Sequence, residues 1–163
     1  KAQLALYNMY CSAMFNVAFR IVSDKTLGEE IMQDSFLKAF TKLDSYSGKV
    51  TFGAWLKKIV INTSINELKK ANQFQFESLN EGNEFEDINE NDIISYNELK
   101  AEQILKTIQS LKSNYKIILT LFFIEGYDLE EISSILNISN ENCRTTMSRA
   151  KESLRKKLND NER

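Results

Sequence analysis

The chain contains no proline and only five glycines among its 163 residues, and this scarcity of helix breakers constrains the fold more than any other feature. Proline interrupts helices and glycine supplies most tight turns, so their scarcity favours long uninterrupted helices over strands joined by turns. Hydrophobic residues make up 42% of the chain, which is enough to bury a core. No apolar run approaches the ~18 residues of a membrane span, so we expect no membrane insertion.

Apolar residues recur at helical spacing in three segments of the first half. Residues 2–22 carry one apolar stripe, formed by Leu4, Tyr7, Cys11, Met14, Ala18 and Val22. A second helix is predicted to begin with a capping box of Thr26 and Glu29 and to end in the turn-forming stretch "DSYSGK". A third helix is predicted from near Thr51 to about Lys70, with Trp55 on its buried side. These three helices with short connections predict a small helical domain over residues 1–71.

Residues 72–95 are rich in Asn, Asp and Glu and show no sustained period, so we interpret them as a linker. Helical periodicity returns over residues 96–163, with helices expected at 96–111, 114–125, 128–136 and from Ser139 onward. Residues that start or end these helices can also be predicted. We expect left-handed residues at the helix ends Gly126 and Asn137, a capping box of Asp128 and Glu131, and an N-cap at Ser139. The predicted fold class is all-α, with helical domains at 1–71 and 96–163 joined by an acidic linker.

Charge is distributed unevenly along the chain, although the net charge is only −2. Residues 1–70 contain ten basic and six acidic residues, whereas residues 71–110 contain two basic and nine acidic ones. Residues 144–163 contain seven basic and three acidic residues. Two basic surfaces separated by an acidic spacer suit a protein that contacts a polyanion at two places. The alternative is that both basic regions are ordinary solvent-exposed helix faces on either side of a loop.

The sequence offers no catalytic constellation. It has no histidine, which removes the usual general base at neutral pH, and its two cysteines lie far apart, which disfavours a zinc site. It lacks a glycine-rich phosphate loop, a nucleophile elbow and a dinucleotide fingerprint. We therefore expect no catalytic residue, no metal, no cofactor and no small-molecule substrate. The two cysteines suggest reduced thiols in a cytoplasmic protein.

The segment "DLEEISSILNISNENCRTTMSRAKESLRKKL" predicts a helix, a short turn and a second helix. This is the layout of a helix-turn-helix, whose second helix enters the major groove with its N-terminal residues on base edges. An apolar stripe of Cys143, Met147, Ala150, Leu154 and Leu158 indicates the packing side of that helix. The candidates for DNA contact are Asn140, Glu141, Arg144, Thr145, Ser148, Arg149 and Lys151. An ordinary amphipathic C-terminal helix is the alternative.

The stretch "YKIILTLFFIEGYDLEEISSILNISNENCRTTMSRAKESLRKKL" resembles the promoter −35 binding region of bacterial sigma factors, specifically the extracytoplasmic-function (ECF) group. Upstream, "EEIMQDSFLKAF" resembles the segment that docks on the polymerase clamp, and "TFGAWLKKIVINTSINELKK" resembles the segment that melts and reads the −10 element. The modules occur in the order and spacing of that family. The resemblance implies a transcription initiation factor whose partners are core RNA polymerase (its β′ clamp and β flap), promoter DNA and an anti-sigma factor.

The resemblance also implies roles for polar residues of the first domain. It makes Glu30, Gln33, Asp34 and Leu37 the contacts to the β′ clamp. It assigns the −10 element to the loop "DSYSGKVTF" and to the following helix, through Ser47, Lys49, Lys58, Asn62, Asn66 and Lys69. The residues alone show a polar stripe from Lys58 to Lys69, for which a solvated face is the alternative. The sequence departs from the family at Thr146, where many relatives carry a basic residue, and at the acidic Glu141.

Two other classes of protein remain possible from the residues alone. One is a two-domain helix-turn-helix regulator that binds duplex DNA without polymerase. The other is a helical protein-interaction module with an incidental basic end. The stripe from Lys58 to Lys69 separates the first rival from the sigma factor hypothesis, because a regulator that binds only duplex DNA has no need of it.

Overall fold

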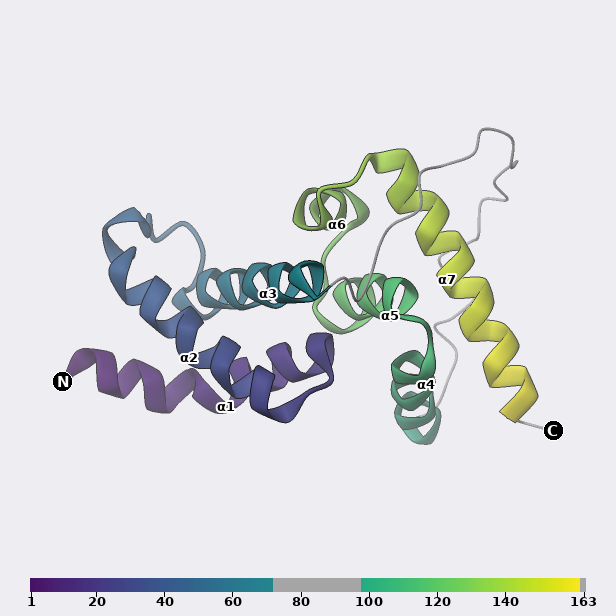
Figure 1. The fold of residues 1–163 in the computed structure, drawn as a ribbon, viewed down its shortest axis with the longest axis horizontal. Coiled ribbons are helices and arrows are strands. Elements are labelled where there is room, and N and C mark those ends of the chain that lie inside the picture. Colours follow the sequence, from purple (N-terminus) through teal and green to yellow (C-terminus); the bar gives the residue numbers. More distant parts are fainter. Residues whose placement is uncertain (72–97, 162–163) are drawn as a thin grey trace. The chain divides into compact units, whose positions relative to one another are not determined.

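The computed structural model describes the backbone of residues 1–71 and 98–161 and the side chains of residues 1–71 and 101–160. The elements within these ranges are helices joined by turns, with no strand among them (Figure 1). The all-α fold class predicted from the sequence is therefore confirmed. The chain divides into two compact units, Lys1–Gln73 and Phe74–Arg163.

The N-terminal unit is built from three helices, α1 (Ala2–Val22), α2 (Lys25–Thr41) and α3 (Phe52–Lys70), with a short 3-10 turn at Leu43–Ser45. Each of the three helices packs against the other two (Figure 1). Their shared core contains the fully buried side chains of Ala18, Ile21, Ile31, Phe36, Leu56, Val60, Ile61 and Ile65. Burial of these apolar side chains is the main stabilising term of the unit.

The crossing of α1 and α2 depends on a small residue at one point. A Cβ atom placed on Gly28 would lie 3.3 Å from the Phe15 ring and 3.6 Å from the Phe19 backbone. Glycine therefore lets the two helices approach closely there.

The predicted capping box of Thr26 and Glu29 at the start of α2 is wrong. Asp24 is the N-cap, and its carboxylate accepts a hydrogen bond from the Leu27 N–H over 3.0 Å.

The C-terminal unit contains α4 (Glu98–Ser110), α5 (Ser113–Leu119), the π-helical turn η3 (Thr120–Ile124), α6 (Leu129–Leu136) and α7 (Asn140–Asn161). Helix α7 packs against α4, α5 and α6. The buried apolar side chains at these contacts include Ile108, Ile117, Leu119, Leu121, Ile132, Leu136, Cys143, Met147, Ala150 and Leu154. The predicted packing side of the last helix is thus confirmed, except that Leu158 is only half-buried.

Local sequence signals define the turn between α6 and α7, as predicted. Asp128 and Glu131 form a reciprocal capping box at the start of α6. Asn137 adopts the left-handed conformation with φ 56°, and the Ile138 N–H donates to the Ser133 carbonyl over 3.0 Å, which closes the end of α6. Ser139 then caps α7 by accepting from the Asn142 N–H over 3.0 Å. These bonds fix the direction in which α7 leaves the turn.

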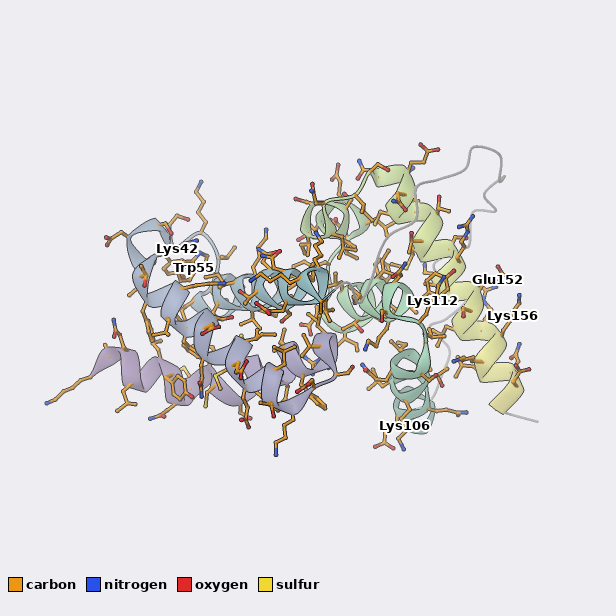
Figure 2. All side chains as sticks on the ribbon, in the orientation of Figure 1. Lys42, Trp55, Lys106, Lys112, Glu152 and Lys156 are labelled. Carbon is orange, nitrogen blue, oxygen red and sulfur yellow. The ribbon has the colours of Figure 1, made fainter. Side chains whose placement is uncertain are left out.

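Two residues of the N-terminal unit that were predicted to be buried are not buried. Leu4 was expected on the apolar stripe of the first helix but is 64% exposed. Trp55 was expected in the core but is only half-buried near the start of α3 (Figure 2). Its ring packs on Tyr46, with the ring centroids 5.1 Å apart, so the loop before α3 covers one side of the indole.

Candidate polymerase and nucleic-acid interfaces

The four residues expected to contact polymerase share one exposed face of α2. Glu30, Gln33, Asp34 and Leu37 follow the spacing i, i+3, i+4 and i+7, which places them on neighbouring turns of one helix side. All four are exposed, and Leu37 is 66% exposed. The opposite side of α2 is buried in the core. The face therefore combines two carboxylates, an amide and one apolar contact, which suits a partner with basic and apolar groups.

A polar stripe runs along α3. Its members Lys58, Asn62, Asn66 and Lys69 are all exposed, while Leu56, Val60, Ile61, Ile65 and Leu68 on the other sides are buried. The stripe offers amide groups, which can donate and accept at a base edge, between ammonium groups, which attract phosphate. The helix thus presents an extended surface with the chemistry of a single-strand groove.

The loop before α3 is closed by its own hydrogen bonds. The Tyr46 hydroxyl donates to the Val50 carbonyl over 2.6 Å, and Gly48 takes a positive φ of 74° that a side chain would disfavour. The Thr51 hydroxyl caps α3 by accepting from the Ala54 N–H over 3.2 Å. These contacts leave the side chains of Ser47 and Lys49 exposed at the tip of the loop.

Four aromatic rings connect this loop to α1 and α3, a feature that the sequence prediction missed. Ring centroids lie 5.7 Å apart for Tyr10 and Phe52, 6.0 Å for Tyr46 and Phe52, and 5.7 Å for Phe52 and Trp55. All four rings are half-buried. Gly53 permits this packing, because a Cβ atom there would lie 2.9 Å from the Tyr10 ring. The cluster anchors the loop beside the N-terminal end of the polar stripe.

Helix α7 presents only part of the expected DNA-facing set. Asn140, Glu141, Arg144 and Arg149 are exposed, and Ser148 is half-buried. Two members differ from the prediction, as Thr145 is only 3% exposed and Lys151 only 7% exposed.

Each of these two buried residues has a contact within the C-terminal unit. The Thr145 hydroxyl donates to the Glu141 carbonyl over 2.9 Å. The Lys151 ammonium lies 5.1 Å from the centroid of the Phe122 ring and 6.0 Å from that of Phe123. Lys151 therefore belongs to the packing of α7 against η3 rather than to an exposed face.

Several polar side chains at the start of α7 form hydrogen bonds within the helix-turn-helix. The Ser133 hydroxyl on α6 lies 2.7 Å from the Asn140 amide oxygen. The Thr146 hydroxyl donates to the Asn142 amide oxygen over 3.2 Å, so Thr146 is turned toward its own helix. On the packing side, burial raises the pKa of the Cys143 thiol to about 11, against an opposing effect of Arg144. Cys143 is thus a neutral core residue.

Among the residues whose side chains are described, no group of three or more histidine, cysteine, aspartate or glutamate side chains could hold a metal ion. Within the same part of the chain, every helix is too short or too polar to cross a membrane.

Both units match known sequence families. Residues 6–74 match the family described as Sigma-70 region 2, and residues 101–154 match Sigma-70, region 4. The two matches occur in that order in one chain and define a sigma-70 type transcription initiation factor.

Similarity over nearly the whole chain identifies the subfamily of sigma factors. The chain is 26% identical over 164 residues to the ECF RNA polymerase sigma factor SigW of Bacillus subtilis, covering 95% of this chain and 88% of SigW.

A second relative is the ECF RNA polymerase sigma-E factor of Escherichia coli K12, 26% identical over 138 residues, which cover 79% of this chain and 72% of that protein. The chain belongs to the ECF subfamily of RNA polymerase sigma factors. The resemblance seen in the sequence is confirmed.

Solved structures share the fold. The sigma factor RpoE of Bartonella quintana, in complex with the anti-sigma factor NepR, superposes with a TM-score of 0.61 at 20% identity and covers 95% of each chain. CnrH, in complex with the cytosolic domain of CnrY, gives a TM-score of 0.56 at 19% identity, covering 98% of this chain and 88% of CnrH. At these identities the likeness concerns the fold.

Proposed function

We propose that this ECF sigma factor binds core RNA polymerase through α2, reads the −10 element with α3 and its preceding loop, and reads the −35 element with α7. The observation that carries the proposal is the pairing of two exposed faces on adjacent helices of one packed unit. The α2 face of Glu30, Gln33, Asp34 and Leu37 suits a protein surface, and the α3 stripe suits unpaired bases. One rigid unit can thereby hold a DNA strand at a fixed place on the polymerase.

We assign these activities to the domains predicted from the sequence, with residues 1–71 as region 2, 72–95 as linker and 96–163 as region 4. The family matches at 6–74 and 101–154 and the division of the chain between Gln73 and Phe74 support this assignment. Because the two DNA contacts belong to one chain, binding of the first unit raises the effective concentration of the second unit at its DNA site. Each unit alone therefore needs only modest affinity for DNA. The β flap of polymerase is the proposed second contact, made by region 4.

On α7, the proposed −35 contacts are Asn140, Glu141, Arg144, Ser148 and Arg149, all of which are exposed or half-exposed. Thr145 and Lys151, also expected at this surface, are proposed only as supports of the helix because they are buried. In region 2, Ser47, Lys49, Lys58, Asn62, Asn66 and Lys69 form the proposed −10 surface. The protein acts by binding, not by catalysis, in the cytoplasm where the polymerase works. An anti-sigma factor is the proposed regulator, by analogy with the complexes named for RpoE and CnrH.

The test is reconstitution. The full chain is mixed with bacterial core polymerase and promoter DNA from its own genome, and start-site-specific transcripts are measured. We expect transcripts only when the chain is present, and binding to core enzyme that weakens when Asp34→Ala and Leu37→Ala are combined. Absence of core binding and of transcripts from every native promoter would reject the proposal. Binding of promoter duplex without any core binding would instead support the regulator alternative.

A further inference from the structure

The loop that joins α2 to α3 is held at both ends by backbone hydrogen bonds. The Tyr46 N–H donates to the Leu43 carbonyl over 3.0 Å, which closes the 3-10 turn before the loop. The Trp55 N–H donates to the Thr51 carbonyl over 3.0 Å, which closes the first turn of α3. Between these two bonds lie residues 47–50, all of which are exposed. Their conformation therefore depends on contacts that cross the loop itself.

The side chain of Tyr46 makes such a contact. Its hydroxyl donates to the Val50 carbonyl over 2.6 Å, so side chain and backbone close a ring around residues 47–49. The Tyr46 ring centroid lies 5.1 Å from that of Trp55 and 6.0 Å from that of Phe52, both at the start of α3. One tyrosine thus ties the exposed loop to the helix that carries the polar stripe.

We propose that Tyr46 is a positioning residue for the −10 element, because its hydroxyl holds Ser47 and Lys49 in the conformation that binds the DNA strand. The inference rests on the proposed −10 role of this loop. A loop that is ordered before binding avoids the entropy cost of being ordered by its ligand, so its affinity for that ligand is higher. In this role Tyr46 acts only through the residues that it holds.

The chemistry at the tip of the loop explains why its conformation matters. The Ser47 hydroxyl can donate to a base edge or accept from it, and the Lys49 ammonium attracts phosphate. The Lys49 N–H donates to the Ser47 hydroxyl oxygen over 3.4 Å, which is long for a hydrogen bond. The bond from Tyr46 is shorter and spans the whole tip. Loss of the Tyr46 hydroxyl should therefore release both side chains without removing either.

Tyr46→Phe tests the inference, because it removes the hydroxyl and keeps the ring against Trp55. The full chain is bound to core polymerase, and fluorescence anisotropy measures its affinity for a single-stranded oligonucleotide carrying the −10 element of a promoter that the native chain transcribes. We expect binding to weaken about fivefold, the usual effect of one lost hydrogen bond, with unchanged affinity for core polymerase. Tyr7→Phe is the matched control. It removes a hydroxyl from a ring that packs on Phe36 in the same unit, and it should leave both affinities unchanged.

A double-mutant cycle separates positioning from a general loss of stability. When Ser47→Ala and Lys49→Ala are combined, the side chains that Tyr46 is proposed to hold are absent. Adding Tyr46→Phe to this pair should then cause almost no further loss of affinity for the oligonucleotide. A full further loss would overturn the inference, because the hydroxyl would then act through other groups.

A measurement without DNA reports on the loop alone. Trypsin cleaves after lysine, and the peptide bond between Lys49 and Val50 lies inside the ring that the Tyr46 hydroxyl closes. Cleavage of a native protein requires local opening, so fragments ending at Lys49 should form about fivefold faster from Tyr46→Phe than from the native chain or from Tyr7→Phe. Mass spectrometry at early times measures these rates.

The two measurements distinguish failure of this inference from failure of the proposed function. Equal cleavage rates in Tyr46→Phe and the native chain would reject the closure of the loop, whether or not the chain binds DNA. Faster cleavage together with an unchanged affinity for the −10 oligonucleotide would reject the positioning role of Tyr46 and leave the proposed function intact.

Discussion

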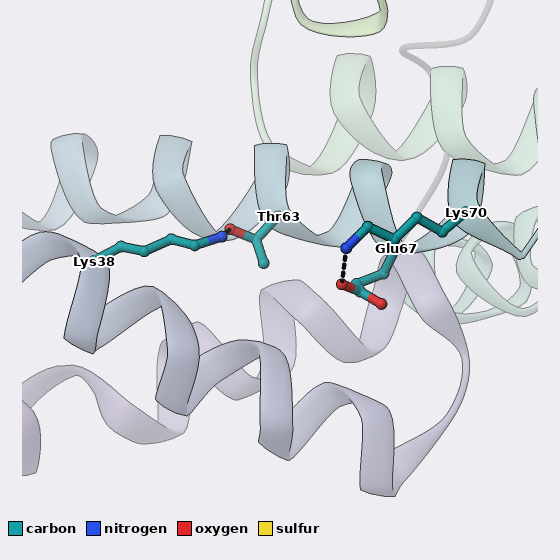
Figure 3. Close-up of polar contacts among 4 residues, drawn as sticks. All are labelled: Lys38, Thr63, Glu67 and Lys70. Atoms are coloured by element: carbon teal, nitrogen blue, oxygen red, sulfur yellow. Dashed lines mark hydrogen bonds and ion pairs between the residues drawn. The ribbon is translucent and has the colours of Figure 1, made fainter.

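The ammonium group of Lys38 on α2 donates a hydrogen bond to the hydroxyl of Thr63 on α3 over 3.2 Å (Figure 3). Thr63 is only 6% exposed, and its hydroxyl donates in turn to the Ile59 carbonyl over 2.8 Å. Lys38 follows Leu37 of the proposed polymerase face, and Thr63 follows Asn62 of the proposed −10 stripe. The bond therefore joins the two helices that we propose to contact the polymerase and the −10 strand.

Replacing Thr63 with valine keeps the shape of the side chain but removes the acceptor for Lys38. We expect Thr63→Val to lower the free energy of unfolding of the N-terminal unit by about 1 kcal/mol, the usual net value of one such bond. Urea unfolding followed by circular dichroism measures this change. Thr41→Val is the control, because the exposed Thr41 hydroxyl bonds only within its own helix, to the Leu37 carbonyl. Equal effects of the two substitutions would mean that the contact between the helices adds nothing.

The polar stripe of α3 can be separated experimentally from the −35 surface. Asn62→Ala combined with Asn66→Ala removes two exposed amides without disturbing the buried side of the helix. We expect this double variant to reduce promoter opening, measured by permanganate reactivity of unpaired thymines, while binding of −35 duplex stays within about twofold of the native value. Asn16→Ala, at an exposed site on α1, should change neither quantity. Equal losses in opening and in −35 binding would contradict the assigned roles.

Arg149 and Lys151 lie two residues apart on α7 and should behave differently. Arg149 is exposed, so Arg149→Ala should weaken binding to −35 duplex and reduce the slope of log affinity against log salt by about one. Lys151 is 7% exposed and lies over the Phe122 ring, so Lys151→Ala should leave that slope unchanged. It should instead lower the stability of the C-terminal unit by about 1–2 kcal/mol through lost packing and cation–π contact. Titrations of duplex DNA at several salt concentrations, with thermal unfolding of each variant, measure both effects. Identical salt slopes for the two variants would show that burial does not separate their roles.

The sequence predicted the elements whose signals are local. The capping box of Asp128 and Glu131, the left-handed Asn137 and the apolar stripe of α7 each depend on residues within about one turn of their neighbours in the pattern. All three are confirmed, apart from the half-buried Leu158 at the end of the stripe. The start of α2 was misjudged because Asp24 and Thr26 are both capable N-caps, and the sequence does not decide between them.

The contents of the candidate site were harder to predict than the helices. Lys151 continues the spacing of Met147 and Leu154 along α7, yet its charge argued for an exposed position. The rings of Phe122 and Phe123, which the preceding turn η3 brings to α7, contribute to making burial of its long stem favourable. The contact of Ser133 with Asn140 likewise joins two helices across a turn, so no periodicity within either helix reveals it.

Cys143 should make the stability of the C-terminal unit depend on pH in the alkaline range. Its side chain is fully buried, and burial raises the pKa of its thiol from 9.0 to about 11. The thiol of the unfolded chain loses its proton at lower pH than that of the folded chain, so the folded state binds more protons between pH 9 and 11. The contribution of Cys143 to stability is therefore complete below pH 9 and is lost as the pH rises through this window, by about 3 kcal/mol in total.

Urea unfolding at pH 8 and pH 10.5 measures this loss for the native chain and for Cys143→Ala. Lysines and tyrosines also titrate in this range, so the informative quantity is the difference between the two pH dependences. We expect a steeper loss of stability in the native chain, whereas Cys11→Ala, at a half-buried site in the other unit, should follow the native curve. At pH 8 iodoacetamide should label Cys11 well before Cys143, since the Cys143 thiol is buried and protonated. Parallel curves for the native chain and Cys143→Ala, together with equal labelling of both thiols, would show that Cys143 does not titrate as a core residue.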